Sequence, residues 1–403
     1  MGRLSAVSAR IAGYHAGRAP DLLARKFAIM ASSPFAFYRG SCQLFVDAWP
    51  RTTPLNDTPA VWSCGDLHFE NLGCYKGDNR LVYFDINDFD ESALLPLSWD
   101  LVRFTASVFV GATELRVSAA DATALANSYL DAFTVALAHG KARWVERETA
   151  TGMARELIDA VRSRKRKALL AERTEKRRGR RRILVDGTKA LKADKEDIAR
   201  VTKLMQHLGE NAGRKKFYRV LDVARRVAGC GSLGLTRWIV LVEGKGSPRG
   251  NFLLDLKEAR SPASAGKSPH RQPAWKTDAE RIVTVQSRVQ AVSPALLAHV
   301  SMNGVGYVLR ELQPLQDRMR MEGWAGNIEN LRDAVTTMGR VTAWAALRAS
   351  GRQGSAIADD LIVFAGARGW RGEVVAMARR VAARTMTEWR AFRADVKSGA
   401  LSG

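Results

Sequence analysis

The sequence has few cysteines and no long apolar segment. Its four cysteines, Cys42, Cys64, Cys74 and Cys230, are scattered over 403 residues without the spacing of an extracellular disulfide framework, so we expect free thiols in a reducing cytoplasm. No run approaches the roughly 18 apolar residues of a membrane span, and the most apolar one, LVRFTASVFVGA, is interrupted by Arg103. We therefore expect a soluble, cytoplasmic protein with no membrane partner. An organelle presequence within residues 1–20, which lack acids, is the alternative.

Acidic residues are also scarce relative to basic ones. The chain has 41 Asp and Glu against 63 Lys and Arg, which gives a formal net charge of +22. Such an excess favours binding of anions, including nucleic acids, nucleotides and acidic membrane surfaces. Net charge alone does not indicate which of these the protein binds. A composition of 46% hydrophobic and 26% charged residues is typical of a globular protein with one large or two medium domains.

Nearly half of the net charge lies in residues 162–182. This basic tract holds twelve Lys or Arg against Glu172 and Glu175, an excess of ten positive charges. Its simplest interpretation is a solvated helix followed by a linker, and the alternative is a surface that contacts a polyanion such as RNA or DNA. The lack of aromatic residues in the tract argues against base stacking.

Hydrophobic periodicity divides the chain into three parts. Residues 1–182 are expected to form the first part of a helical lobe, with a hairpin in 60–92 and helices in 97–175. Residues 183–318 are rich in strand-like runs, including TRWIVLVEG, NFLLDLKEA and GYVLREL, with a helix from about Asp278 and a mobile excursion at SPASAGKSPHRQPAW. Residues 319–403 are expected to be helical and to complete the first lobe.

Between Ala60 and Asp100 the charge reverses sign. Eight acidic residues face only Lys76 and Arg80 there; they are Asp66, Glu70, Asp78, Asp85, Asp88, Asp90, Glu91 and Asp100. Such clustering costs repulsion unless a cation or basic neighbours compensate it. Asp66 follows a strand and a glycine, Asn71 comes five residues later, and Asp85 ends the run LVYF, so the three can converge at one turn. Oxygen ligands of this kind suit Mg²⁺, and a further aspartate can accept a proton from a hydroxyl group.

The motifs in this segment resemble those of aminoglycoside and choline phosphotransferases in the protein-kinase-like superfamily. CGDLHFEN is similar to their catalytic loop, YFDINDFDES to their metal-binding segment, and LSWDLVRF to the helix start that follows. The resemblance implies that Asp66 is the catalytic base, Asn71 a metal ligand and Asp100 a structural brace. The second metal ligand is either Asp85, slightly preferred from its distance to Asn71, or Asp88, which begins the sequence DFD.

Kinase-like proteins place a nucleotide-binding lobe before the catalytic loop, whereas only about sixty residues precede that loop in this chain. The missing features occur downstream instead. A glycine-rich turn, in which backbone amides approach phosphates closely, is expected in AGCGSLG, with Gly229, Gly231, Ser232 and Gly234. Lys257 is expected to pair with nucleotide phosphates, and either Glu280 or Gln286 to be its partner on the next helix. An ordinary turn and a solvated lysine are the alternatives.

Over nearly its full length the chain resembles the bacterial family known as domain of unknown function 2252. The resemblance is carried by SPFAFYRG, CGDLHFENLG, FDINDFDES and WDLVRF, and it implies no substrate. Three further residues are expected to support the site. His68 orients the catalytic loop rather than binding zinc with Cys64 and Cys74, Arg39 holds a phosphate or braces the acidic residues, and Asp90 belongs to the acidic cluster.

These observations predict an α+β fold of the protein-kinase-like, two-lobed type in circularly permuted order, with a larger helical lobe and a small antiparallel-sheet lobe. The expected function is ATP- and Mg²⁺-dependent phosphoryl transfer to an unknown hydroxyl acceptor. Three alternatives stay open: nucleotidyl transfer, a nucleotide-binding pseudokinase, and a basic nucleic-acid-binding protein without catalysis. The oligomeric state is not predicted.

Overall fold

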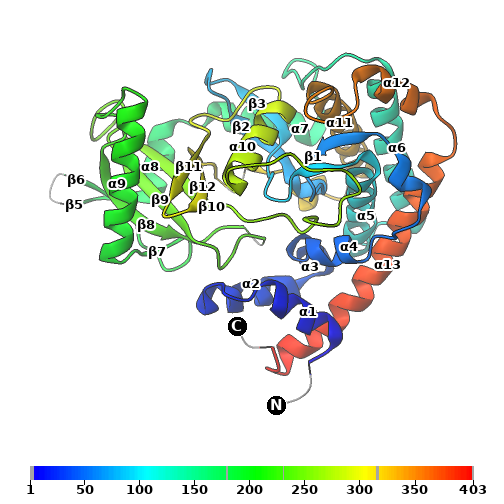
Figure 1. Ribbon diagram of the computed structural model, residues 1–403, viewed down its shortest axis with the longest axis horizontal. Coiled ribbons are helices and arrows are strands. Elements are labelled where there is room, and N and C mark those ends of the chain that lie inside the picture. Colours follow the sequence, from blue (N-terminus) through cyan, green and yellow to red (C-terminus); the bar gives the residue numbers. More distant parts are fainter. Residues whose placement is uncertain (1–3, 178–179, 230, 315–316, 402–403) are drawn as a thin grey trace.

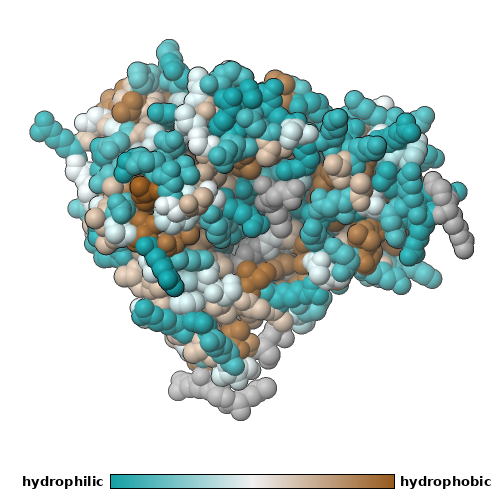
Figure 2. All heavy atoms as spheres, turned by 180° about the vertical axis from the view of Figure 1, so that it is seen from behind, coloured by the Kyte–Doolittle hydropathy of each residue, from teal (hydrophilic) through white to brown (hydrophobic). Residues whose placement is uncertain are grey.

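The computed structural model describes residues 4–177, 180–229, 231–314 and 317–401, so the prediction of a free thiol at Cys230 falls outside it. Figure 1 shows a mixed α+β molecule in which a β-rich part and a helix-rich part lie side by side. Figure 2 shows hydrophilic side chains over most of one face, as the charge of the chain predicts. No helix among the described residues has the length and apolar character needed to cross a bilayer.

The β-rich part is built on one six-stranded antiparallel sheet. Its spatial order is β11-β12-β10-β9-β8-β7, with bounds β7 Ala190–Lys192, β8 Val220–Arg226, β9 Arg237–Val242, β10 Phe252–Glu258, β11 Ala298–Met302 and β12 Val305–Glu311. The central strands β9 and β10 are buried on both faces, in keeping with the apolar runs WIVLV in β9 and FLL in β10. The structure thus contains the antiparallel sheet expected after residue 183.

Helices cover both faces of this sheet. One face packs on α9 (Lys195–Asn211), where Val201 and Met205 contact the side chains of β9 and β10. The other face packs on Leu170 of α8 (Arg166–Arg173). Helix α10 (Asp278–Val289) lies against β11 and β12.

The helix-rich part combines segments from both ends of the chain (Figure 1). Its helices are α5 Leu97–Leu115, α6 Ala119–Ala138, α7 Gly152–Ser163, α11 Ile328–Arg348, α12 Ala358–Gly366 and α13 Trp370–Lys397, with the short helix η4 Met321–Trp324. Helix α11 packs closely on α6, because a Cβ at Gly339 would lie 2.3 Å from the carbonyl oxygen of Tyr129. The expected helical tail is therefore present and returns to helices that precede the sheet.

Two small β pairs carry the acidic segment. Strand β2 (Leu72–Lys76) pairs with β3 (Val82–Ile86) across the expected KGDN turn. Strand β1 (Ala60–Ser63) pairs with β4 (Ala93–Pro96), and the one-turn helix η2 (Phe69–Asn71) lies between β1 and β2. The two pairs bring the residues after β1 and those after β3 together.

Residues 4–50 form a helical layer that connects the two parts. It consists of α1 Ala6–Tyr14, α2 Pro20–Ser32, α3 Pro34–Gly40 and α4 Cys42–Asp47, followed by η1 Pro54–Asp57. The backbone nitrogen of Ala19 donates to the carbonyl of Gly234 in the β-rich part, 3.0 Å away. The hydroxyl of Ser5 donates to Asp395 near the other end of the chain, 2.5 Å away, so the two ends lie side by side.

Two expectations need correction. The basic tract is not simply a helix and a linker, because β5 (Thr174–Arg177) and β6 (Arg180–Ile183) pair as a hairpin in its second half. The SPASAGKSPHRQPAW segment is not a detached excursion. Gln272 accepts a hydrogen bond from the backbone of Leu94, and Trp275 packs edge-on against Trp62. Such anchors hold an irregular segment without regular secondary structure.

Candidate functional site

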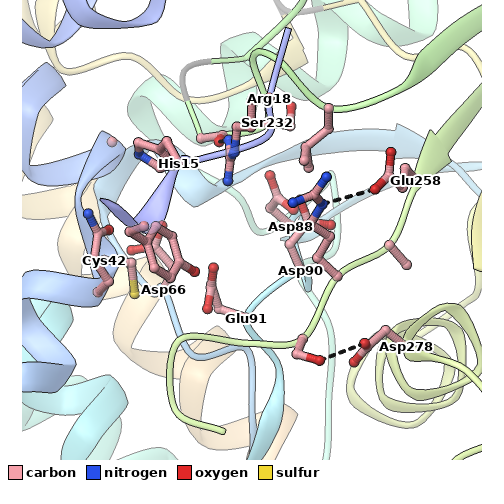
Figure 3. A pocket seen from close by; sticks show the side chains of 18 of the residues that line it. His15, Arg18, Cys42, Asp66, Asp88, Asp90, Glu91, Ser232, Glu258 and Asp278 are labelled. Carbon is pink, nitrogen blue, oxygen red and sulfur yellow. Dashed lines mark hydrogen bonds and ion pairs between the residues drawn. The ribbon is translucent and has the colours of Figure 1, made fainter. Parts of the chain in front are cut away.

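A cavity of about 460 Å³ lies where the helical layer, the acidic segment and the β-rich part meet. Figure 3 shows acidic side chains on one side of it and Arg18 and Ser232 on another. Asp66, Asp88 and Asp90 come from the acidic segment, whereas Gly231 and Ser232 come from the loop between β8 and β9. The structure therefore brings together two groups of predicted site residues that lie more than 140 positions apart in the sequence.

Gly65 turns the chain so that Asp66 faces this cavity. Its φ angle is +79°, and a Cβ there would lie 2.0 Å from the carbonyl oxygen of Glu91. Only glycine tolerates both this left-handed backbone and such a close approach. The carboxyl group of Asp100 braces the same turn by accepting a hydrogen bond from the backbone nitrogen of Cys64, 3.3 Å away. Burial raises the pKa of Asp100 to about 6, although hydrogen bonds from Ser63, Cys64 and Gly65 oppose the rise.

Arg103 holds the carboxylate of Asp66. Its Nε and Nη2 donate to Asp66 Oδ1 at 2.9 and 2.7 Å, and Nη2 also donates to the carbonyl of Tyr38 at 2.8 Å. The guanidinium lies 3.7 Å from the centre of the Tyr38 ring, and the side chain is 1% exposed. Burial raises the pKa of Asp66, and the positive charge of Arg103 opposes that rise. Both donors use Oδ1, so Oδ2 of this cavity-lining residue is not held by Arg103.

Sequence reasoning missed this role of Arg103. The residue was noticed only because it interrupts an apolar helix. That interruption was the usable signal, since a buried arginine almost always has a charged or hydrogen-bonding partner.

Asn71 connects the two loops of the acidic segment. Its Nδ2 donates to the carbonyl oxygens of Asp66 and Asp88, each 3.1 Å away, and its Oδ1 accepts a hydrogen bond of 2.8 Å from the backbone nitrogen of Asp88. The residue is 2% exposed. Asn71 therefore fixes the spacing between the Asp66 turn and the Asp88 loop.

Asp88 lines the cavity, whereas Asp85, the slightly preferred metal ligand, does not. The Asp85 carboxylate binds Arg348 at 2.8 Å and the backbone nitrogen of Ala291 at 3.1 Å, and its side chain is 2% exposed. The Asp88 side chain is 36% exposed and lies 3.6 Å from Arg318. Burial acts to raise the pKa of Asp88, but the positive charges of Lys257 and Arg318 outweigh it and lower that pKa. The assignment of metal ligands stays a prediction.

Lys257 reaches from strand β10 to the acidic loop. Its Nζ lies 2.6 Å from Asp90 and 3.7 Å from Asp88, and its side chain is 7% exposed. The ion-pair partners of Lys257 are thus on the acidic loop rather than on α10, where Glu280 accepts a hydrogen bond from the backbone of Lys276 and Gln286 is buried. The alternative of a solvated lysine is excluded by this burial.

The glycine-rich loop joins β8 to β9 and borders the cavity with Gly231 and Ser232. Gly229 and Gly234 have φ angles of +76° and +87°. A Cβ at Gly231 would meet no atom within 4 Å, so its backbone faces open space. Arg18, also missed by sequence reasoning, supports the loop by donating from Nη1 to the carbonyls of Gly231 and Leu233, at 2.8 and 3.0 Å.

The other supporting residues have structural partners. Arg39 forms an ion pair with Glu70 and also lines the cavity, so the bracing interpretation describes its contact. His68 is buried against the Phe35 ring, with 6.0 Å between the ring centres, and burial lowers its pKa. Among the described residues, no group of three His, Cys, Asp or Glu side chains has the arrangement of a metal site. This finding gives no support to zinc binding through His68.

The oxygen atoms near Asp88 fit a weakly held Mg²⁺ better than a metal enclosed by protein ligands. The Asp88 carboxylate faces the cavity, and Asn71 Oδ1 lies next to the backbone of the same residue. Mg²⁺ commonly takes one or two protein oxygens and fills its remaining positions with water and substrate phosphate. Of the two residues, Asp88 lines the cavity, whereas Asn71 is 2% exposed and does not line it, so magnesium binding stays a prediction that rests on Asp88.

The chain belongs to a family described as an uncharacterized protein conserved in bacteria, the domain of unknown function 2252, whose model matches residues 18–395. No curated protein and no solved structure matches the chain.

Proposed function

We propose that this protein is a kinase-like phosphotransferase that uses ATP and Mg²⁺ to phosphorylate a hydroxyl acceptor. The observation that carries the proposal is the shared cavity. A glycine-rich loop borders it on one side and the Asp66 turn and the Asp88 loop border it on another. Lys257, on β10, does not itself line the cavity but forms ion pairs with the lining residues Asp90 and Asp88.

The order of elements in the β-rich part supports nucleotide binding there. Strands β8, β9 and β10 follow one another in the chain, the glycine-rich loop joins the first two, and Lys257 lies on the third. Protein kinases likewise cover the phosphates with a glycine-rich loop and place the phosphate-binding lysine on the third strand. Because the helical part includes segments before and after this sheet, we further propose that the fold is a circular permutation of the kinase-like arrangement.

The residues around Asp66 support phosphoryl transfer. Asp66 Oδ2 can accept the proton of an acceptor hydroxyl, while Arg103 fixes the carboxylate through Oδ1. Lys257, which now pairs with Asp90 and Asp88, would exchange these partners for nucleotide phosphates. Asp88 would hold Mg²⁺, which neutralises phosphate charge when bound, and Asn71 would fix the loop that carries Asp88. Most of the rate enhancement would come from positioning and charge compensation.

A thermal-shift titration tests the nucleotide part of this proposal. We expect ATP with Mg²⁺ to raise the unfolding midpoint of the wild type, because a ligand at 100 times its Kd adds about 2.7 kcal/mol of stability. Asp88→Asn and Lys257→Met should reduce the shift, whereas Asp359→Asn, at an exposed position on α12, should retain it. If millimolar ATP with Mg²⁺ does not raise the unfolding midpoint of the wild type, the proposed function is wrong.

Transfer itself requires a second measurement. Full-length protein incubated with γ-labelled ATP and cell extract should pass label to an acceptor, and Asp66→Asn should abolish this transfer while retaining the ATP shift. Labelled pyrophosphate with no labelled acceptor would indicate nucleotidyl transfer instead.

A further inference from the structure

The wall of the cavity beside Asp66 is built by the helical layer rather than by the acidic segment or the sheet. His15 follows α1, and Arg39, Cys42 and Gln43 lie on α3 and α4. The Cys42 Sγ lies 3.6 Å from the carbonyl of Gly65, which places this wall directly over the Asp66 turn. The glycine-rich loop borders a different side of the cavity, so the wall is free to contact something other than the nucleotide phosphates (Figure 3).

This wall presents polar atoms that the described protein atoms do not satisfy. Gln43 is 4% exposed and its Nε2 has no hydrogen-bond partner. His15 is 1% exposed, and its ring interacts with the backbone of Gly40. The Nε of Arg39 is also unpaired, although Nη1 of the same guanidinium binds Glu70. A buried polar group left unpaired costs about 1 to 3 kcal/mol, so their gathering at one cavity wall indicates a ligand that pairs with them.

The character of these atoms defines the ligand. The Gln43 amide nitrogen and the Arg39 Nε are donors only, and they therefore require oxygen acceptors on the ligand. The charged neighbours of His15 are Lys26, Arg18 and Arg260, whereas those of Cys42 on the same wall include Asp66 and Glu91, so the wall has charges of both signs. A cavity of about 460 Å³ accommodates a small molecule and not a folded protein or a duplex.

We propose that this wall is the acceptor subsite and that it binds a small, oxygen-rich hydroxyl compound, either a neutral polyol or an oxyanion. The inference rests on the phosphotransferase proposed above. In the transfer, the acceptor oxygen forms a bond to the γ-phosphorus of ATP, the bond between that phosphorus and the bridging oxygen breaks, and ADP leaves with the electron pair. The hydroxyl proton passes to Asp66 Oδ2. Gln43 and Arg39 bind the other oxygens of the acceptor.

The chemical class is tested with γ-labelled ATP and a fractionated extract. Material below about 1 kDa, within the size range that a cavity of this volume holds, is divided by ion exchange into neutral, anionic and cationic fractions, and the macromolecules form a fourth. We expect label in the neutral or the anionic fraction, which distinguishes a polyol from an oxyanion. Label in the cationic or the macromolecular fraction overturns the inference while leaving the phosphotransferase intact.

Variants of the wall provide the second measurement. Gln43→Met keeps the length of the side chain and removes its amide, so it should raise the KM for the labelled acceptor at least tenfold and change the KM for ATP less than twofold. Thr105→Val is the matched control, because Thr105 is also fully buried with an unpaired hydroxyl but does not line the cavity. Equal effects of the two variants on the acceptor KM would overturn the subsite.

Two further outcomes separate this inference from the proposed function. Mg²⁺-dependent ATP binding without transfer into any fraction would overturn the acceptor subsite and leave a nucleotide-binding protein. Absence of Mg²⁺-dependent ATP binding would remove the phosphotransferase and the subsite together.

Discussion

The pair formed by Arg103 and Asp66 makes a stability prediction that requires no knowledge of the substrate. Replacing Arg103 with methionine retains a long side chain and removes the guanidinium. The variant loses two hydrogen bonds to Asp66 Oδ1 and one to the carbonyl of Tyr38. It also leaves the Asp66 carboxylate in the cavity wall without its counter-charge.

The structure sets the size of the effect. Removing one partner of a buried ion pair costs about 3 to 5 kcal/mol, and the 21% exposure of the Asp66 side chain favours the lower end of that range. Three hydrogen bonds to charged groups, at about 1.5 kcal/mol each, lead to a similar figure. We therefore expect Arg103→Met to lower the free energy of unfolding by about 3 kcal/mol.

A double-mutant cycle in urea measures this directly. Asp66→Asn removes the charge that Arg103 compensates, so the double variant should be more stable than the sum of the single effects predicts, by about 2 kcal/mol. The matched control is Arg10→Met. Arg10 pairs with Asp47 near the surface, where the two side chains are 36% and 31% exposed. This control substitution should lower the free energy of unfolding by less than about 1 kcal/mol. A cost of Arg103→Met as small as that of the control, or strict additivity in the cycle, would refute the reasoning.

Three further predictions concern the same site. Burial raises the pKa of Asp100 from 3.8 to about 6, so its contribution to stability is full below pH 3.8 and is lost as the pH rises through 6. In the wild type this loss lowers the free energy of unfolding by about 3 kcal/mol between pH 4 and 6. Asp100→Asn should remove that decline, which urea titrations at each pH would measure. Gly65→Ala forces a Cβ to within 2.0 Å of the Glu91 carbonyl at a φ of +79°. The left-handed backbone alone costs about 1 to 3 kcal/mol, and the clash adds to it, so the unfolding midpoint in a thermal scan should fall by more than the backbone strain alone would cause. A midpoint equal to that of the wild type would contradict the close packing. Asp88→Asn should reduce the stabilisation by ATP and Mg²⁺ in calorimetry, whereas Asp85→Asn should lower the midpoint without ligand and retain the full ligand-induced shift; the reverse pattern would favour Asp85 as the metal ligand.

The parts of the site that could be predicted are those that depend on contiguous residues. The turn at Gly65 and Asp66, the hairpin across KGDN and the glycine-rich loop each follow from a few neighbouring positions. Their local rules concern backbone conformation and strand pairing, which short sequences determine. The meeting of the glycine-rich loop with Asp66 was also expected, although from a family resemblance rather than from local physics.

The parts that could not be predicted depend on long-range packing. Arg103 lies 37 positions from Asp66, and His15 and Gln43 form a cavity wall with residues beyond position 230. No periodicity in the sequence encodes such contacts, because the tertiary arrangement of helices determines them. The sequence did carry one general signal, since an arginine in an apolar helix and a glutamine in the buried α4 both require partners when the helix is packed.

Asp85 and Asp88 differ in their position relative to the end of strand β3. Asp85 lies within β3, opposite Gly73 of β2, so the alternation of the strand fixes the direction of its side chain. That direction leads to Arg348 and away from the cavity. Asp88 lies two residues after the end of β3, where the pairing no longer constrains it and the loop can turn toward Lys257. When two carboxylates compete for one role, the one beyond the end of the strand is therefore the better candidate for a site that opens at that end.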